Sequence, residues 1–279
     1  MRRARWLVPL WPWLAAPVAS QSSSIQAERD AYASWLATAP VSPLAAIAQQ
    51  PIGLGMRLGP SDADVPLDGV HELRVSQRGG AVTLDGGADR RPLPRGLSVR
   101  VGRYTLMADG PPGRAVLTVF GPRHSARRPS YYPSGSPLIF VGPIAPPERP
   151  GTVRVLGVDG VEVEAVEAGS VLVELDGTRT RLMVRRLPTS GGEESELEIF
   201  FRDGTNGKGT YPAGRFVALV PEGADRYRLD FNRARNPFCA YSSAYACPAP
   251  WRGNTIPAPV EAGERYEGAA PAAPDTTGG

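Results

Sequence analysis

The segment VEVEAVEAGSVLVELDGTRTRLMVRRL, from Val161 to Leu187, carries the clearest β-hairpin signal in the chain. Apolar and polar residues alternate on both sides of Asp176-Gly177. An Asp-Gly pair between two alternating runs is typical of a two-residue hairpin turn, because both turn positions need positive φ angles. The alternation turns one face of each strand towards a core. We therefore predict two paired antiparallel strands that meet at Asp176-Gly177.

Shorter runs with the same alternation lie on both sides of this hairpin. They are HELRVSQ (71–77), AVTLDGG (81–87), LSVRVGRYTLMAD (97–109), AVLTVFG (115–121), ELEIFFRDG (196–204), RFVALVP (215–221) and DRYRLDFN (225–232). The 32 glycines and 30 prolines favour short strands and turns over long helices. We predict a mainly β protein with two β-rich domains, the first of which is a β-sandwich.

The first twenty residues are typical of an export signal. Three arginines within the first five residues precede an apolar stretch from Trp6 to Ala16, and small residues follow it. This order predicts a signal peptide that is cleaved after Ser20, and the alternative is an uncleaved N-terminal anchor. The apolar stretch is short for a membrane span, which needs roughly 20 apolar residues. We expect an exported protein, periplasmic or secreted, without a transmembrane segment after cleavage.

One helix and a proline-rich connection complete the expected organisation. Apolar side chains fall near one face from about Ser24 to Thr38, before Pro40 and Pro43 interrupt the pattern. The expected segments are a signal peptide (1–20), a helical lead (21–50), a first sandwich (51–122), a proline-rich linker (123–150), a second β-rich domain (151–267) and a disordered tail (268–279).

The charge balance argues against a nucleic-acid partner. The formal net charge is +3, and it falls to zero without the three arginines of the predicted signal. A near-neutral chain lacks the basic surface that nucleic-acid binding requires. The two cysteines, Cys239 and Cys247, lie close together in the sequence. In an oxidising compartment we expect them to form a disulfide.

Two segments resemble a known family. The first is FFRDGTNGKGTYPAGRF (Phe200 to Phe216), and the second is LDFNRARNPFCAYSSAYACPAPWRGNTIPAPVEAGERY (Leu229 to Tyr266). Together they resemble the signature of the bacterial and archaeal domain-of-unknown-function family 1684. That signature contains Asp-x-Thr-x-Gly, Thr-Tyr-x-x-Gly-Arg, Asp-Phe-Asn-x-x-x-Asn-Pro-x-Cys-Ala-Tyr and a final Gly-Glu. The resemblance implies a shared fold and a shared site, and it implies no activity.

The segment GLGMRLGPSDADVPL, from Gly53 to Leu67, is similar to the start of a forkhead-associated sandwich. Forkhead-associated domains read phosphothreonine with an Arg, a Ser and a His in their loops. Here Pro60 follows Gly59 where the binding Arg is expected, and the Ser-x-x-His pattern is missing. The resemblance therefore implies a forkhead-associated-like scaffold that does not read phosphopeptides.

Polar side chains gather at the ends of the strands that carry the family signature. The candidate site residues are Asp203, Thr205, Thr210, Tyr211, Arg215, Asp230, Asn232 and Asn236. If these strands are neighbours, the polar ends converge on one rim. The rim then offers carboxylates, amides, a phenol and a guanidinium group that can bind a carboxylate or phosphate in a bidentate manner.

Three functions are compatible with such a rim. The first is the binding of a small polar ligand or of a cell-envelope partner. The second is a hydrolase or lyase that uses Asp203 and Asp230 as an acid and base pair. The third is a structural network in which the same side chains only satisfy loop backbone and each other. Whether the protein is an enzyme stays open at this point.

Other chemistries have weaker support. His71 and His124 both lie outside the signature, which argues against a Ser-His-Asp triad. Two carboxylates alone make a poor metal site. No glycine-rich loop follows a strand and precedes a helix, so we expect no cofactor.

Overall fold

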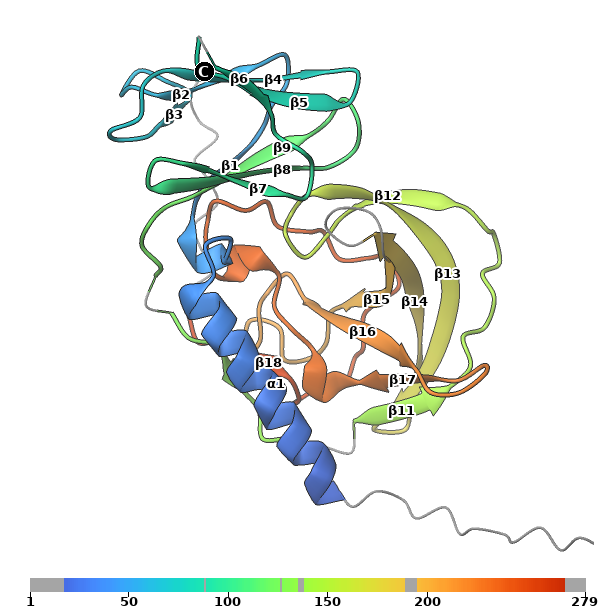
Figure 1. Ribbon diagram of the computed structural model, residues 1–279. Coiled ribbons are helices and arrows are strands. Elements are labelled where there is room, and N and C mark those ends of the chain that lie inside the picture. Colours follow the sequence, from blue (N-terminus) through green and yellow to red (C-terminus); the bar gives the residue numbers. More distant parts are fainter. Residues whose placement is uncertain (1–17, 88, 126, 135–137, 189–194, 269–279) are drawn as a thin grey trace, which may run out of the picture.

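The computed structural model describes residues 18–87, 89–125, 127–134, 138–188 and 195–268. A small sandwich of two sheets lies against a larger β-rich unit, and one long helix runs along the side of that larger unit (Figure 1). The predicted mainly β class is therefore confirmed. The predicted signal peptide (1–20) and the predicted disordered tail (268–279) lie almost entirely outside the described residues.

Helix α1 spans Val18–Thr38, so it begins earlier than the predicted Ser24 and ends where predicted. The chain then enters a short 3-10 helix, η1 (Pro43–Ala45). The Ser42 side chain links the two helices, because its hydroxyl donates to the Leu36 carbonyl at 2.6 Å and accepts from the Leu44 N–H. A capping hydroxyl of this kind satisfies backbone groups that a helix end leaves unpaired. In the described part of the chain, no helix has the length and apolarity to cross a membrane.

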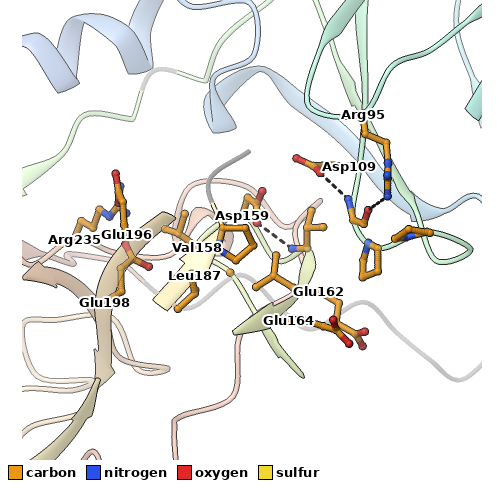
Figure 2. A pocket seen from close by; sticks show the side chains of 17 residues that line it. Arg95, Asp109, Val158, Asp159, Glu162, Glu164, Leu187, Glu196, Glu198 and Arg235 are labelled. Carbon is orange, nitrogen blue, oxygen red and sulfur yellow. Dashed lines mark hydrogen bonds and ion pairs between the residues drawn. The ribbon is translucent and has the colours of Figure 1, made fainter. Parts of the chain in front are cut away.

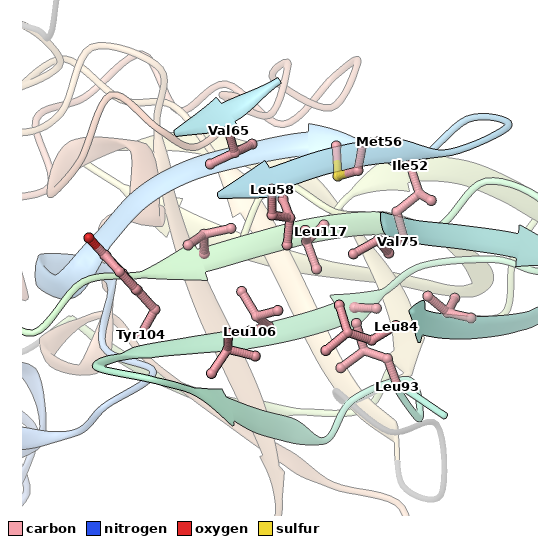
Figure 3. Packing of buried hydrophobic residues seen from close by; sticks show 14 of the residues in the cluster. Ile52, Met56, Leu58, Val65, Val75, Leu84, Leu93, Tyr104, Leu106 and Leu117 are labelled. Carbon is pink, nitrogen blue, oxygen red and sulfur yellow. The ribbon is translucent and has the colours of Figure 1, made fainter. Parts of the chain in front are cut away.

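The N-terminal unit is a sandwich of a four-stranded and a five-stranded sheet. Its strands are β1 (Ala46–Pro51), β2 (Met56–Gly59), β3 (Val65–Pro66), β4 (Leu73–Arg78), β5 (Ala81–Asp85), β6 (Arg90–Pro92), β7 (Ser98–Val101), β8 (Tyr104–Asp109) and β9 (Val116–Phe120). The sheet orders are β1-β9-β8-β7 and β3-β2-β4-β5-β6. Leu58, Val75 and Leu84 from one sheet pack with Leu106 and Leu117 from the other in a single core (Figure 3).

The boundaries of this unit differ from the sequence expectation at its start. Residues 46–50, predicted within the helical lead, form β1 and pair with β9 at the edge of the four-stranded sheet. The predicted strand 97–109 is a hairpin of β7 and β8 that turns at Gly102, where φ is +55°. The similarity of the sandwich to forkhead-associated domains stays a prediction.

The C-terminal unit is built on a seven-stranded antiparallel sheet. Its strands are β11 (Ile139–Gly142), β12 (Thr152–Leu156), β13 (Glu162–Leu175), β14 (Thr178–Pro188), β15 (Ser195–Phe201), β16 (Arg215–Pro221) and β17 (Tyr227–Asp230), in the order β11-β17-β16-β15-β14-β13-β12. A small second sheet pairs β10 (Ser130–Tyr131) with β18 (Glu264–Arg265). Two 3-10 helices, η2 (Phe231–Arg233) and η3 (Phe238–Ala240), follow β17.

The predicted central hairpin is confirmed as β13 and β14. Asp176 and Gly177 occupy the turn with φ angles of +50° and +72°, as the Asp-Gly pair indicates. A register shift between Glu167 and Gly169 bends β13. At this bend Ala145 pairs with Ser170 of β13. The segment after β11, which begins at one edge of the sheet, thus contacts a strand near the opposite edge.

The proline-rich segment 123–150, predicted as a linker, also supplies strands to the C-terminal unit. It contributes β10 and β11 to the C-terminal unit, where they pair with β18 and β17. The prediction treated proline content as evidence of a connection. Both strands are short and contain no proline themselves, and Pro129 and Pro143 lie just outside them, where no ladder hydrogen bond is lost.

Candidate functional site

The carboxylate and guanidinium that sequence analysis placed on an open rim form a sealed ion pair. Asp203 follows β15 directly, and Arg215 is the first residue of β16, which pairs with β15. Their side chains have no solvent exposure, and Arg215 Nη2 lies 2.9 Å from Asp203 Oδ2. Because both partners are inside, neither charge is available to a ligand from solvent.

The remaining polar atoms of this pair bind the C-terminal segment of the chain. Arg215 donates to the carbonyls of Val260 at 2.9 Å, Ala262 at 2.5 Å and Glu264 at 3.3 Å. Asp203 Oδ1 accepts from the Val260 N–H at 3.1 Å. The pair therefore clamps residues 260–264 against the sheet. This geometry favours the structural alternative for Asp203 and Arg215.

The loop between β15 and β16 is held by the same kind of internal bond. The Asp203 carboxylate accepts from the backbone and the hydroxyl of Thr205 at 2.8 and 2.5 Å. The Thr205 hydroxyl also lies 2.8 Å from that of Thr210. Asn206 bridges the loop, accepting from the Asp203 N–H and donating to the Tyr211 carbonyl. This network satisfies buried polar groups that would otherwise destabilise the fold.

Asp230 belongs to a different network. It accepts from the backbone and the amide of Asn232 at 3.0 and 2.9 Å, and it pairs with Arg233. Arg233 also pairs with Glu28 at 2.9 Å, so this network ties helix α1 to the end of β17. Asp203 and Asp230 share no hydrogen-bond partner among the interactions of the described residues. The structure thus divides the predicted rim into two internal networks.

The predicted disulfide is absent, which is a correction. Cys239 is buried, Cys247 is exposed, and both are free. Cys239 packs in an apolar cluster with Leu36 and Tyr245. The Tyr211 hydroxyl lies 3.4 Å from Cys247 Sγ. The two thiols do lie near each other, and their hydrogen bond lowers the pKa of Cys247, but the sulfur atoms are not in bonding geometry.

Asn236 is the one predicted site residue that lines a described pocket. This small pocket holds about 190 Å³ and also contains Tyr241 and Glu264. Glu264 is 1% exposed and accepts hydrogen bonds from the Tyr241 hydroxyl and the Asn236 N–H. Burial raises the pKa of Glu264, although these bonds oppose the shift. Sequence analysis named the Gly-Glu motif but assigned Glu264 no role.

A larger cavity lies where the two units meet (Figure 2). It holds about 670 Å³, which is within the range of small-molecule sites. The sandwich contributes Arg95 and the end of β8 with the following turn, residues 109–112. The larger unit contributes the turn at 157–164, the end of β14, and β15. Because both units supply walls, the cavity exists only when they pack together.

Carboxylates dominate the charged lining of this interface cavity. The lining contains six carboxylates and only two guanidinium groups, those of Arg95 and Arg235. The carboxylates belong to Asp109, Asp159, Glu162, Glu164, Glu196 and Glu198. Arg235 is already paired with the buried Glu198 at 2.5 Å. The Asp109 carboxylate and the Arg95 guanidinium both bond to the Gly110 backbone. Glu162 pairs at 2.6 Å with Arg114, which lies outside the lining. Six carboxylates still outnumber three guanidinium groups, so the cavity has an excess of negative charge.

Asp159 has the most perturbed carboxyl group of the lining. Burial, together with the nearby charges of Asp109 and Glu198, raises its pKa to about 6, and the hydrogen bond from the Val161 N–H opposes the shift. In the view of Figure 2, Asp159 lies between the Glu198–Arg235 pair and Asp109. Perturbed carboxyl groups in a cleft are a common feature of functional sites.

The substitution Asp159→Asn is expected to stabilise the protein at pH 7.5 and to change its stability little near pH 4. The folded-state pKa of about 6 exceeds the ordinary value of 3.8. The unfolded chain therefore binds fewer protons between pH 4 and 6, and stability falls as pH rises through that window. The full shift corresponds to about 2–3 kcal/mol above pH 6. Urea unfolding at both pH values measures it.

Asp225→Asn is the matched control, because Asp225 is exposed and does not line the cavity. It should leave the free energy of unfolding unchanged within about 0.5 kcal/mol at both pH values. Equal stability of Asp159→Asn and the wild type at pH 7.5 would contradict a half-buried Asp159 that is ionised at a cost to the folded state.

Sequence analysis missed the interface cavity, and the reason is physical. Its residues come from turns and strand ends that are far apart in the chain, such as Asp109 and Asp159. These two residues each come at or after the end of a strand and precede a glycine, which is an ordinary turn pattern. Only the packing of the two units brings them to one place.

The fold and this cavity define a class of two-unit β protein, in which a small sandwich packs on a larger seven-stranded unit and a cavity lies between them. Residues 128–265 match the model of the family described as protein of unknown function (DUF1684). This segment of the chain belongs to that family, as its signature motifs predict. It contains the larger unit and excludes the sandwich.

Several solved chains are similar to part of this chain. One of them is the solution NMR structure of an uncharacterized protein of Haloarcula marismortui, with 31% sequence identity and a TM-score of 0.43. The match covers 50% of this chain and 77% of that chain. No curated protein matches the sequence.

Proposed function

We propose that this protein binds a small organic cation in the interface cavity. The observation that carries the proposal is the lining itself, a cavity of about 670 Å³ in which carboxylates outnumber guanidinium groups six to two. A cation offsets the mutual repulsion of these carboxylates. Its attraction should be strongest at Asp159, whose pKa is raised by burial.

The spread of the carboxylates favours an extended ligand over a single metal ion. In the parts of the chain that the structure describes, no three metal-ligating side chains converge on one point. Glu164 and Asp109 stand on walls supplied by different units. A polyamine or another diamine separates its charges by several ångströms and can meet carboxylates on both walls.

The rim proposed from sequence has weaker support as the binding place. The oxygens of Asp203 and Asp230 accept hydrogen bonds from within the chain, and neither residue lines a described pocket. An acid–base reaction at these two carboxylates lacks a cavity for its substrate. The predicted export signal adds the proposal that binding takes place in the periplasm or outside the cell.

Thermal unfolding with matched compounds tests the proposed function. Putrescine and spermidine should raise the melting temperature of the wild type, by roughly 5 °C at a 100-fold excess over Kd. Butane-1,4-diol has the length of putrescine without its charge, and it should give no shift. The double variant Asp109→Asn/Glu164→Gln should lose most of the putrescine shift, because each unit then lacks one carboxylate.

Glu148→Gln is the matched control, since Glu148 is exposed and lies outside the cavity lining. It removes the same kind of charge, and it should retain the wild-type response to putrescine. An equal response of the double variant and the wild type would show only non-specific charge binding and would overturn the proposal. The absence of any amine-dependent shift would overturn it as well.

A further inference from the structure

The small pocket at Asn236 contains a buried acceptor that the fold does not use. Asn236 is 2% exposed, and its amide nitrogen donates to the Arg265 carbonyl at 3.1 Å. That bond fixes the orientation of the amide. Asn236 Oδ1 then has no hydrogen-bond donor among the described residues. Buried polar atoms are almost always paired, so an unpaired one in a residue that lines a pocket points to a donor supplied from outside.

The floor of this pocket is rich in acceptors. Glu264 lines the same pocket, and its buried carboxyl group accepts hydrogen bonds from the Tyr241 hydroxyl and the Asn236 N–H. Both groups come from the family signature, one from the Asn-Pro motif and the other from the final Gly-Glu. A hydroxyl or amino group that reaches the floor therefore finds oxygen acceptors.

The mouth of the pocket is rich in cationic donors. Arg127 and Arg128 line it together with Ser130, and Arg265 lines it with Glu267, to which it is paired at 3.0 Å. Arg127 is held in place, because its guanidinium donates to the Ala240 carbonyl at 2.6 Å and lies 4.4 Å from the centre of the Tyr266 ring. Arg128 is exposed. Neighbouring guanidinium groups bind carboxylate and phosphate oxygens by charge-assisted hydrogen bonds.

The size of the pocket limits the ligand. A volume of about 190 Å³ corresponds to about six water molecules at roughly 30 Å³ each. We infer that the Asn236 pocket binds a small organic anion that carries a hydroxyl or amino donor, with the anionic group on Arg127 and Arg128 and the donor on Asn236 Oδ1. This site is separate from the interface cavity, and it lies in the segment that the family shares apart from Arg127, Tyr266 and Glu267 at its edges.

Pairs of probes that differ by one donor test the floor without disturbing the fold. L-lactate is compared with propionate, and glycerol 3-phosphate with propyl phosphate, by isothermal titration calorimetry on the full chain. A hydroxylated probe should bind, and its partner without hydroxyl groups should bind at least ten-fold more weakly, because it leaves Asn236 Oδ1 unpaired. Equal affinities within both pairs would overturn the assignment of the floor.

The variant Arg128→Ala tests the mouth. It should weaken binding of the hydroxylated anions at least five-fold while the melting temperature stays unchanged. Arg123→Ala is the control, because Arg123 is also exposed and does not line the pocket. The inference is overturned if neither hydroxylated probe binds the wild type, or if Arg128→Ala and Arg123→Ala bind equally well. Putrescine binding in the interface cavity should be the same in both variants, so a failure here is distinguishable from a failure of the proposed function.

Discussion

Replacing Arg215 with methionine is expected to lower the free energy of unfolding by about 3–5 kcal/mol. The substitution leaves the Asp203 carboxylate buried without its cation, since both side chains are fully enclosed. It also removes the donors to three carbonyl groups between residues 260 and 264. A buried group that loses its partner retains its full desolvation penalty. Urea unfolding monitored by circular dichroism measures the loss.

The matched control for this variant is Arg179→Met. Arg179 pairs with Glu174 at 2.7 Å, but both side chains are more than half exposed. Exposed ion pairs contribute little, so this variant should lose less than about 1 kcal/mol. If Arg215→Met were as stable as Arg179→Met, the Asp203–Arg215 clamp would not be a structural element, and a role in binding would regain support.

The second large effect is expected from Gly263→Ala, which should destabilise the protein by about 3–5 kcal/mol. Gly263 has a φ of +74°, where an L side chain is strained. A Cβ atom there would lie 2.6 Å from the Phe231 carbonyl oxygen and 2.7 Å from that of Ala234. The backbone at Gly263 cannot shift easily to relieve this overlap, because Arg215 holds the carbonyls of Ala262 and Glu264 on either side of it. Urea unfolding measures the change.

Gly253→Ala separates strain from crowding. Gly253 has a φ of +87°, but a Cβ atom there would have no neighbour within 4 Å. Its cost should be the backbone strain alone, about 1–2 kcal/mol. The difference between the two alanine variants then measures how tightly the 260–264 segment packs on the turn after β17. Equal losses would show that this segment yields readily.

The fold class could be predicted because its signals are local. The Asp176-Gly177 turn and the alternation around it depend only on neighbouring residues, and the structure has the hairpin where the sequence indicates it. The boundaries of the units could not be predicted in the same way. The pairing of β10 with β18 joins residues 130–131 to residues 264–265. No local sequence pattern predicts a contact between residues so far apart in the chain.

The candidate site was likewise predictable only in part. Sequence analysis found polar residues that the family signature keeps together, and it could not tell a buried ion pair from an exposed one. Asp203 and Arg215 have the residue types of a binding site, yet their environment makes them a clamp. The carboxylates of the interface cavity are the converse case, because each looks ordinary until the two units pack. Burial and long-range packing decide function here, and both are properties of the folded chain.

The central claim is that ligand binding occurs between the two units and not at the enclosed Asp203–Arg215 pair. Mapping of backbone amide chemical shifts by NMR during a putrescine titration tests it most directly. We expect the largest changes at Asp109 and Gly110 on one wall of the interface cavity and at residues 157–164 on the opposite wall. Changes centred on residues 203–215 and 230–236, with the two cavity walls unaffected, would contradict it.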